Sequence, residues 1–416
     1  MPGEFPIKTA TACQLKWAWS SLYLNIGQTG SCWRTSFSDL TPDNFDQFHN
    51  TPIKIKDRQD MLQGKWPENN CGYCREIEAV GGSSDRMLHL SMPNLVPDRL
   101  WEDASATEVH PKVIDVLFNN TCNLGCLYCS AGLSSTINQE NAKFGTFQKA
   151  GVHLQSAEGT YRSLEASFWR WFETGFPRLS RLHVLGGEPL LMKEFQTLLD
   201  YIERFPNPDC EINIVTNLMI TESRLRSFID TFRSLILRRK IRRVDISASI
   251  DCWGPQQEYV RWGLNLDQWQ KNFLILCQEK WLKLNINQVV TPLTIGTMAD
   301  LMIRLNEWRL ARPIGQYFGD AAPGPDYLKI NIFGDIFLED FERTLSVMPE
   351  DTDEQRAAKQ NMRGLMLRSA ATGPAVEQIR DLLFFLDEKD RRRGTDWKDL
   401  FPWLTAYTHL IDPYVV

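Results

Sequence analysis

Residues 113–129, VIDVLFNNTCNLGCLYC, decide the fold of this chain. The apolar run from Val113 to Phe118 is typical of a strand buried on both faces. It leads directly into Cys122, Cys126 and Cys129, which have the spacing CxxxCxxC. Three thiolates on a loop at the end of a strand can hold three irons of a four-iron cubane, which leaves the fourth iron open to a chelating small molecule. The segment therefore predicts an α/β protein with a [4Fe-4S] cluster beside a strand end.

Zinc is the alternative occupant of these three cysteines. A closed zinc site needs a fourth ligand, usually from a second Cys or His pair nearby. No such pair follows, because the next cysteine is Cys210 and the histidines His153 and His183 stand alone. The spacing therefore favours iron-sulfur over zinc at this loop.

Short apolar strands alternate with amphipathic helices from about residue 108 onward. Repeated strand-helix alternation indicates a parallel sheet covered by helices, with chemistry at the carboxyl ends of the strands. We expect a partial (β/α)6 TIM-like barrel. The strand candidates are Val113–Phe118, Leu182–Leu185, Ile212–Val215, Val244–Ile250, Leu284–Val290 and Leu328–Phe333. The helix candidates are Tyr161–Phe172, Lys193–Phe205, Ser223–Leu237, Leu266–Gln278 and Thr297–Leu310.

The chain divides into three predicted parts. Residues 1–107 form a small N-terminal domain that ends in a polar connector, residues 108–336 form the barrel, and residues 337–416 form a helical C-terminal extension. The extension has no chemistry of its own in the sequence. Cover for the open end of the barrel is its expected role.

Composition and charge exclude several classes of function. The 416 residues include 46 basic and 52 acidic side chains, for a formal net charge of −6, and 43% are hydrophobic. This balance is ordinary for a globular protein and disfavours nucleic-acid binding. The basic runs 238–240 and 391–393 are expected to be solvated. Without an export signal or an apolar run of about 20 residues, we expect a cytoplasmic protein that uses no membrane and whose cysteines bind metal or stay reduced.

The cysteine loop and a second motif together resemble the radical S-adenosylmethionine (SAM) enzymes. Gly186, Gly187, Glu188 and Pro189 follow the second barrel strand, 57 residues beyond Cys129, and match the GGEP motif of that family. In the family this backbone contacts the SAM amino group, and paired glycines permit close approach because they lack Cβ. The resemblance implies that the open iron binds SAM, whose reductive cleavage yields a 5′-deoxyadenosyl radical.

Weaker matches follow on the later strands. Asn217 stands in a Thr-Asn turn where the family often has Thr-Asn-Gly, with Leu218 replacing the glycine. Ser249 and Asp251 are similar to the family's Ser-x-Asp, which meets SAM ribose and carboxylate. Arg261 resembles an arginine that helps to hold the carboxylate.

Purely structural roles for these later residues stay open. Ser249 also suits a helix cap or turn, and Arg261 suits a surface ion pair. The resemblance places Val290 beside the adenine, although a place in the barrel core accounts for it equally well. Cys252, at the end of the fourth strand, is either a small buried hydrophobe or a hydrogen donor to a product radical.

A second cysteine set precedes the barrel. Cys13 and Cys32 flank Gly27 in the order C-x13-G-x4-C, and Cys71 and Cys74 follow as CxxC. Four cysteines suffice for a fully ligated cluster, but they close a zinc site equally well. The order is similar to the half-motif of SPASM and twitch domains, here placed before the SAM core. The resemblance therefore implies an auxiliary [4Fe-4S] cluster in a twitch-like domain, which transfers electrons or staples the fold.

Together these matches imply a radical SAM enzyme that modifies a ribosomally made precursor peptide by backbone excision, crosslinking or epimerisation. The expected cofactors are two [4Fe-4S] clusters and SAM. The expected partners are the precursor peptide, a small peptide-recognition protein and an external electron donor. Two alternatives stay open, a radical SAM enzyme acting on a sugar or nucleoside and a non-catalytic metal-binding interaction protein.

Overall fold

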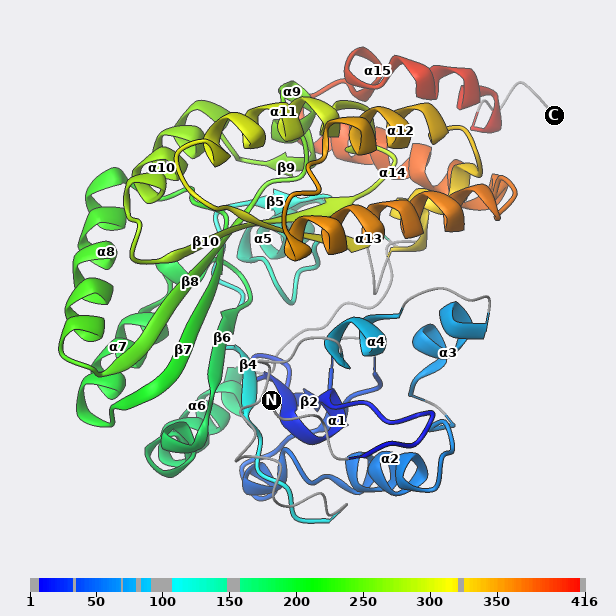
Figure 1. Ribbon diagram of the computed structural model, residues 1–416. Coiled ribbons are helices and arrows are strands. Elements are labelled where there is room, and N and C mark those ends of the chain that lie inside the picture. The colour runs from blue at the N-terminus through cyan, green and yellow to red at the C-terminus, as the bar shows by residue number, and fades with distance from the viewer. Residues whose placement is uncertain are drawn as a thin grey trace. The chain divides into compact units, whose positions relative to one another are not determined.

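The computed structural model describes residues 7–32, 35–68, 70–79, 84–90, 107–147, 158–320 and 325–411. The chain forms two compact units (Figure 1). The first comprises Met1–Thr121, Leu154–Ile214 and Ser223–Asp245, and the second comprises Cys122–His153, Val215–Glu222 and Ile246–Val416.

The strands of the described chain are β1 (Trp19–Tyr23), β2 (Gln28–Gly30), β3 (Ser38–Asp39), β4 (Val113–Leu117), β5 (Gly125–Cys126), β6 (Arg181–Leu185), β7 (Asn207–Thr216), β8 (Ile241–Ser249), β9 (Arg261–Trp262), β10 (Lys283–Val290) and β11 (Gly315–Asp320). The helices are α1 (Leu15–Ala18), α2 (Pro52–Leu62), α3 (Gly72–Ala79), α4 (Asp85–Leu90), α5 (Ser135–Phe144), α6 (Glu158–Gly175), α7 (Lys193–Arg204), α8 (Glu222–Leu237), α9 (Pro255–Val260), α10 (Leu266–Gln278), α11 (Met298–Arg309), α12 (Leu338–Val347), α13 (Asp353–Ala370), α14 (Val376–Arg393) and α15 (Trp397–Leu400).

The first unit is built on a mostly parallel sheet with the strand order β3-β2-β1-β4-β6-β7. Strand β4 is buried along its whole length and pairs in parallel with both β1 and β6. Strands β1, β2 and β3 continue the sheet, and β2 runs antiparallel to both β1 and β3. The N-terminal segment therefore extends the sheet, which the sequence did not predict. The predicted boundary near residue 108 stays a prediction.

Helices α7 and α8 pack beside this sheet through one apolar face each, and Figure 1 shows α8 (green) running alongside the strands. In α8 the buried residues recur at helical spacing. Phe195 of α7 meets Phe228 of α8 with ring centroids 5.5 Å apart. The buried residues of α8 are Leu225, Phe228, Ile229, Phe232 and Leu235.

The second unit contains the end of β8, then β10 and β11, with β10 and β11 parallel. Strands β5 and β9 form a separate antiparallel ribbon. The C-terminal extension is helical as predicted, with α12, α13, α14 and α15. Strand-helix alternation and a mostly parallel α/β architecture are thus confirmed. Barrel closure and the twitch-like domain stay predictions.

One predicted strand is wrong. Residues 328–333 form parts of two 3₁₀ turns, Asp326–Leu328 and Ile330–Phe333, and the strand that follows α11 is Gly315–Asp320 instead. Some predictions lie outside the described residues, namely the polar connector at 95–106 and the end of the C-terminal extension at 412–416.

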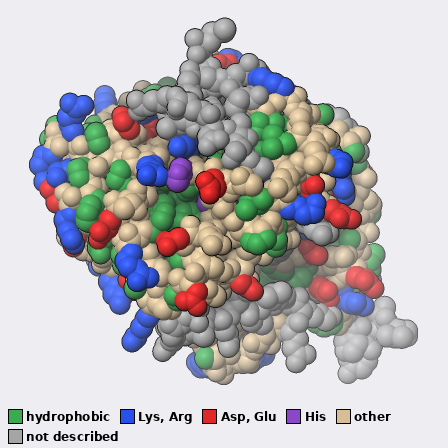
Figure 2. Space-filling model, turned by 90° about the horizontal axis from the view of Figure 1, so that it is seen from below, with side chains coloured by type: hydrophobic (Ala, Val, Ile, Leu, Met, Phe, Trp, Pro, Cys, Tyr) green, Lys and Arg blue, Asp and Glu red, His purple; other side chains and the backbone are tan. Residues whose placement is uncertain are grey.

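The surface is mixed in charge. On the face that Figure 2 presents, basic and acidic side chains are both present, with apolar side chains between them. In the described part of the chain, no helix has the length and apolar character needed to cross a bilayer.

Candidate functional site

The CxxxCxxC loop is held by backbone pairing and by the first turn of the helix that follows it. Cys126 lies in the ribbon opposite Arg261, and the Leu127 amide donates to the Val260 carbonyl at 2.9 Å. The Cys122 amide donates to the Ser135 hydroxyl at 3.0 Å, at the start of α5. The loop is therefore tied at both ends by neighbouring elements of the second unit.

A buried ion pair lies against the same loop. Arg261 donates to both carboxylate oxygens of Asp251, and the Tyr128 hydroxyl donates to that carboxylate at 2.7 Å. The Arg261 guanidinium also lies over the Tyr128 ring, 5.5 Å from its centroid. The Val289 amide gives Asp251 a further hydrogen bond at 2.9 Å. Asp251 and Arg261, both expected as SAM ligands, are thus brought together beside the loop, and their contact with SAM stays a prediction.

The turn after β7 approaches Cys122, the first cysteine of the loop. Asn217 donates to the Cys122 sulfur at 3.8 Å and to the Asn123 side chain at 3.0 Å. Leu218 has φ +57°, a left-handed conformation that glycine adopts readily and leucine rarely does. The backbone at position 218 thus has a conformation that suits glycine better than leucine. Asn272 fixes the turn by donating to the Leu218 carbonyl at 2.8 Å.

The GGEP segment belongs to the first unit and packs on the residue that precedes Cys122. The Glu188 amide donates to the Thr121 carbonyl at 2.7 Å. Gly187 has φ +46°, and a Cβ there would lie 2.3 Å from the same carbonyl oxygen. Only glycine fits this position. Glu188 caps the following turn by accepting from the Leu190 amide at 3.1 Å.

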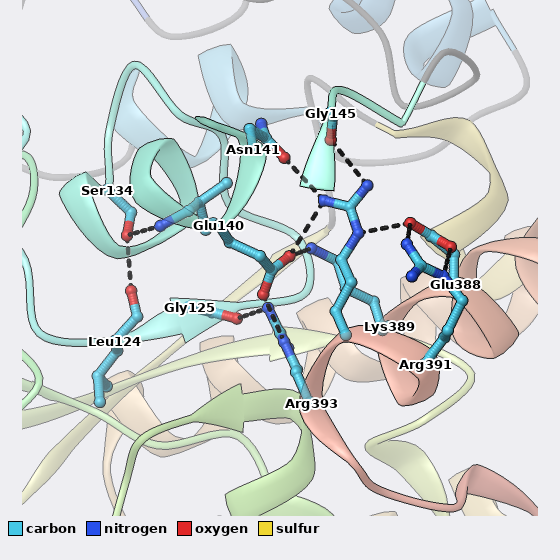
Figure 3. Close-up of polar contacts among 12 residues, drawn as sticks. Leu124, Gly125, Ser134, Glu140, Asn141, Gly145, Glu388, Lys389, Arg391 and Arg393 are labelled. Carbon is cyan, nitrogen blue, oxygen red and sulfur yellow. Dashed lines mark hydrogen bonds and ion pairs between the residues drawn. The ribbon is translucent and has the colours of Figure 1, made fainter. Parts of the chain in front are cut away.

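Helix α14 of the C-terminal extension contacts the cysteine loop through a buried ionic cluster (Figure 3). Arg393 donates to the Gly125 carbonyl at 2.9 Å and to the Glu140 carboxylate at 2.8 Å. Lys389 also pairs with Glu140. The C-terminal extension therefore helps to position the loop, a role that the sequence did not suggest.

The basic run 391–393 is only partly solvated, contrary to expectation. The Arg391 side chain is 57% exposed, whereas those of Arg392 and Arg393 are 2% and 3% exposed. Arg392 forms an ion pair with Glu388, and Arg393 forms one with Glu140. Both buried cations therefore have a carboxylate partner. No local sequence pattern could have identified the ion pairs between α14 and Glu140, because the paired residues are 249 to 253 positions apart in the sequence.

The loop cysteines have the chemistry that an iron-sulfur cluster needs. All ten cysteines are described, and none forms a disulfide. Burial raises the pKa of the Cys126 and Cys129 thiols, and the Arg261 cation opposes that rise. A bound metal would displace these protons.

Within the described ranges, no three Cys, His, Asp or Glu side chains converge as ligands of a single metal ion. A cubane, however, takes each thiolate on a different iron. The three loop cysteines therefore suit a cubane in which one iron has no protein ligand.

The four N-terminal cysteines line one cavity in the first unit. Cys13 is buried in the apolar core of this unit, and Cys32 and Cys71 pack against that core. Cys71 directly precedes helix α3, which contains Cys74. The cavity thus collects the predicted auxiliary ligands. Its other lining residues are Leu15, Lys16, Thr35, Trp66, Asn70, Tyr73, Asp85 and Arg86.

The remaining predicted residues are buried in the second unit. Ser249 is 6% exposed at the end of β8, and Val290 is fully buried in β10. Cys252 is also fully buried, and its thiol lies 3.6 Å from the Gln257 side-chain oxygen. Their roles stay predictions.

No protein-family model matches the sequence, and no curated protein matches it. Two crystal structures of SuiB from Streptococcus suis, one bound to S-adenosylmethionine and one to the precursor peptide SuiA, are similar at 15% identity, with TM-scores of 0.38 and 0.37. The match covers 71% of this chain and 58% of the SuiB chain. The chain therefore spans less than two thirds of SuiB. A likeness of this size does not establish a shared activity.

Proposed function

We propose that this chain is a radical SAM enzyme whose substrate is a ribosomally made precursor peptide. The observation that carries the proposal is the CxxxCxxC loop at the end of β4, held by the β5–β9 ribbon and by the buried pair Asp251–Arg261. A cluster on Cys122, Cys126 and Cys129 would supply reductive cleavage of SAM and a 5′-deoxyadenosyl radical.

In this proposal, residues of the chain bind SAM and orient the side chains around the loop cysteines. The half-buried backbone at Gly186 and Gly187 would meet the SAM amino group, since neither residue has a Cβ to hinder a close approach. Asn217 donates to the Cys122 sulfur, and a donor to a ligating sulfur influences the cluster potential. Ser249 and Val290 are the proposed ribose and adenine contacts. Arg261 fixes Asp251, which in turn holds Tyr128 between two of the cysteines.

The N-terminal cavity is the proposed auxiliary site. Cys13, Cys32, Cys71 and Cys74 provide all four thiolates of a second [4Fe-4S] cluster, so direct ligation of the substrate is disfavoured and electron transfer is favoured. An external donor would supply the reducing electron. Cys252 is a further proposal, as a hydrogen donor to the product radical.

Anaerobic reconstitution followed by iron analysis tests the two-cluster proposal. We expect about eight irons per chain, and about four after Cys122, Cys126 and Cys129 are all replaced by alanine, with loss of 5′-deoxyadenosine formation. Cleavage of SAM at an unchanged rate by that variant would refute the central assignment. Zinc in place of iron would favour a metal-binding interaction protein.

Co-expression with a neighbouring precursor-peptide gene tests the substrate. Mass analysis of the peptide should detect a change that depends on Cys122. An unmodified peptide together with active SAM cleavage would direct the search to a sugar or nucleoside.

A further inference from the structure

A buried lysine lies among the four N-terminal cysteines. Lys16 and Arg86 are the basic side chains among the described residues that line their cavity. Arg86 is neutralised by Glu78, to which it donates from two nitrogens. Lys16 is more deeply buried, with a side chain that is 2% exposed. A buried ammonium at a thiol-lined cavity must be compensated by its surroundings, because burying a charge is costly.

Lys16 is part of a continuous chain of polar contacts. Its Nζ donates to the Ser31 hydroxyl at 3.1 Å and to the Asp57 carboxylate at 2.5 Å. Asp57 also accepts from the Asn70 amide nitrogen at 3.0 and 2.8 Å. The ammonium is therefore held in one position by buried partners.

The residues joined by these polar contacts are close in sequence to three of the cysteines. Ser31 directly precedes Cys32, Asn70 directly precedes Cys71, and Lys16 follows Cys13 by three residues. The polar contacts thus join the segments that carry three of the four thiols. Such an arrangement fixes the thiols relative to one another and to the ammonium.

The cationic end of the Lys16–Asp57 pair faces the thiols. Lys16 lines the cavity that the four cysteines share, whereas Asp57 is not among the described residues that line it.

We propose that Lys16 is the fixed counter-cation of the auxiliary iron-sulfur site and that its charge raises the reduction potential of that site. This inference rests on the proposed function, since it requires the four cysteines to hold a cluster. A cluster that takes up one electron gains one negative charge without making or breaking a covalent bond. A cation buried beside it stabilises the reduced form. Lys16 is thus a positioning and tuning residue rather than a ligand.

The test uses the full chain with Cys122, Cys126 and Cys129 replaced by alanine, so that only the auxiliary cluster remains. Its one-electron reduction is followed by electron paramagnetic resonance during titration with dithionite. Lys16→Met should lower the ratio of reduced to oxidised cluster at least tenfold at a fixed potential, which is a shift of about 59 mV. Lys16→Arg keeps the charge and should stay near the parent.

Lys56→Met is the matched control. Lys56 is a lysine of the same unit whose side chain is 66% exposed and pairs with Asp60 on the surface of α2. Its removal changes the formal charge by the same amount. Because solvent screens an exposed charge, the midpoint potential should not move.

Lys16→Met leaves Asp57 buried without its cation and can therefore unfold the protein. A double variant avoids this unpaired buried charge. The double variant Lys16→Met/Asp57→Asn keeps an acceptor for Asn70 and removes both charges. Its potential should lie between those of Lys16→Met and the parent. Iron content and circular dichroism report whether cluster and fold are retained.

The outcomes separate this inference from the proposed function. A Lys16→Met variant that keeps its cluster at the parental potential overturns the role of Lys16, and a double variant at the parental potential overturns the inference that Lys16 outweighs Asp57. Zinc, or no metal, bound by the parental four cysteines overturns the auxiliary cluster and this inference together.

Discussion

Arg261 donates from Nε and from Nη2 to the two carboxylate oxygens of Asp251, each at 2.8 Å, and the two side chains are 7% and 0% exposed. Tyr128 and the Val289 amide bind the same carboxylate. One buried anion therefore joins the cysteine loop to β9 and β10. Breaking such a pair is costly because it leaves an uncompensated charge inside the protein.

Replacing Arg261 with glutamine should destabilise the chain by about 3–5 kcal/mol, because Asp251 then stays buried without its cation. Urea unfolding measures the loss, and iron analysis should show that the loop cluster is lost first. Arg233→Gln is the control, since Arg233 and its partner Asp230 are 42% and 73% exposed, and it should change stability by less than about 1 kcal/mol. Equal effects of the two substitutions would contradict the importance of the buried pair.

Gly187→Ala should impair SAM binding and stability more than Gly145→Ala. Both glycines have positive φ, so both alanines are strained, by about 1–3 kcal/mol each. At Gly187 the new Cβ would also lie 2.3 Å from the Thr121 carbonyl oxygen, whereas at Gly145 nothing lies within 4 Å. Melting curves and SAM titration of the reconstituted protein compare them. Similar behaviour of the two variants would argue against the close approach at Gly187.

Hydrophobic periodicity predicted most of the parallel strands and of the helices between them. Strands β4, β6, β7, β8 and β10 are apolar runs, and helices α7, α8, α10 and α11 have apolar residues at helical spacing. The sixth strand was misplaced because its sequence, GQYFGD, has two glycines and no β-branched residue. Residues 328–333 have the apolar run expected of a strand, but the chain turns there.

The site was predictable only where the donors lie close together in sequence. Spacing alone indicated Cys122, Cys126 and Cys129 and the GGEP turn. It could not indicate that Arg393 bonds Gly125, since the two are 268 residues apart and neither sits in a recognisable motif for that contact. Lys16 was missed for a related reason, because a lysine in an N-terminal segment is ordinarily solvated.

Leucine at position 218 predicts an unusual order of stability among its variants. Leu218→Gly and Leu218→Ala both remove a fully buried side chain, but only alanine keeps the cost of the left-handed backbone at φ +57°. The glycine variant should therefore be more stable than the alanine variant by about 1 kcal/mol. At Leu225, buried within α8, the order should reverse by about the same amount. Chemical denaturation of the four variants checks both orders, and an alanine advantage at 218 would refute the strain.

Arg393→Met should weaken the hold of helix α14 on the cysteine loop. The variant loses the hydrogen bond to the Gly125 carbonyl and one of the cations around Glu140. We expect lower retention of the loop cluster, slower SAM cleavage and destabilisation of about 1–3 kcal/mol. Arg391→Met, at a side chain that is 57% exposed, removes the same charge and should have little effect. Iron release to a chelator compares the two, and equal release rates would exclude a positioning role for Arg393.

Glu140 gives the stability of the second unit a dependence on pH. Burial raises the pKa of Glu140, but Arg393 and Lys389 lower it by more, so that it lies below its usual value in the folded chain. A carboxyl whose folded pKa is depressed stabilises the fold fully above its unfolded pKa, about 4.3, and loses this contribution as the pH falls through the folded pKa. The stability difference between the parent and Glu140→Gln should therefore be largest near neutral pH and shrink below about pH 4.3.

Urea unfolding of iron-free protein measures this stability difference without interference from cluster loss. Glu354→Gln, at a side chain that is 72% exposed, should differ little from the parent at any pH. A Glu140→Gln difference that stays constant down to about pH 3 would show that the carboxylate does not stabilise α14 through its charge.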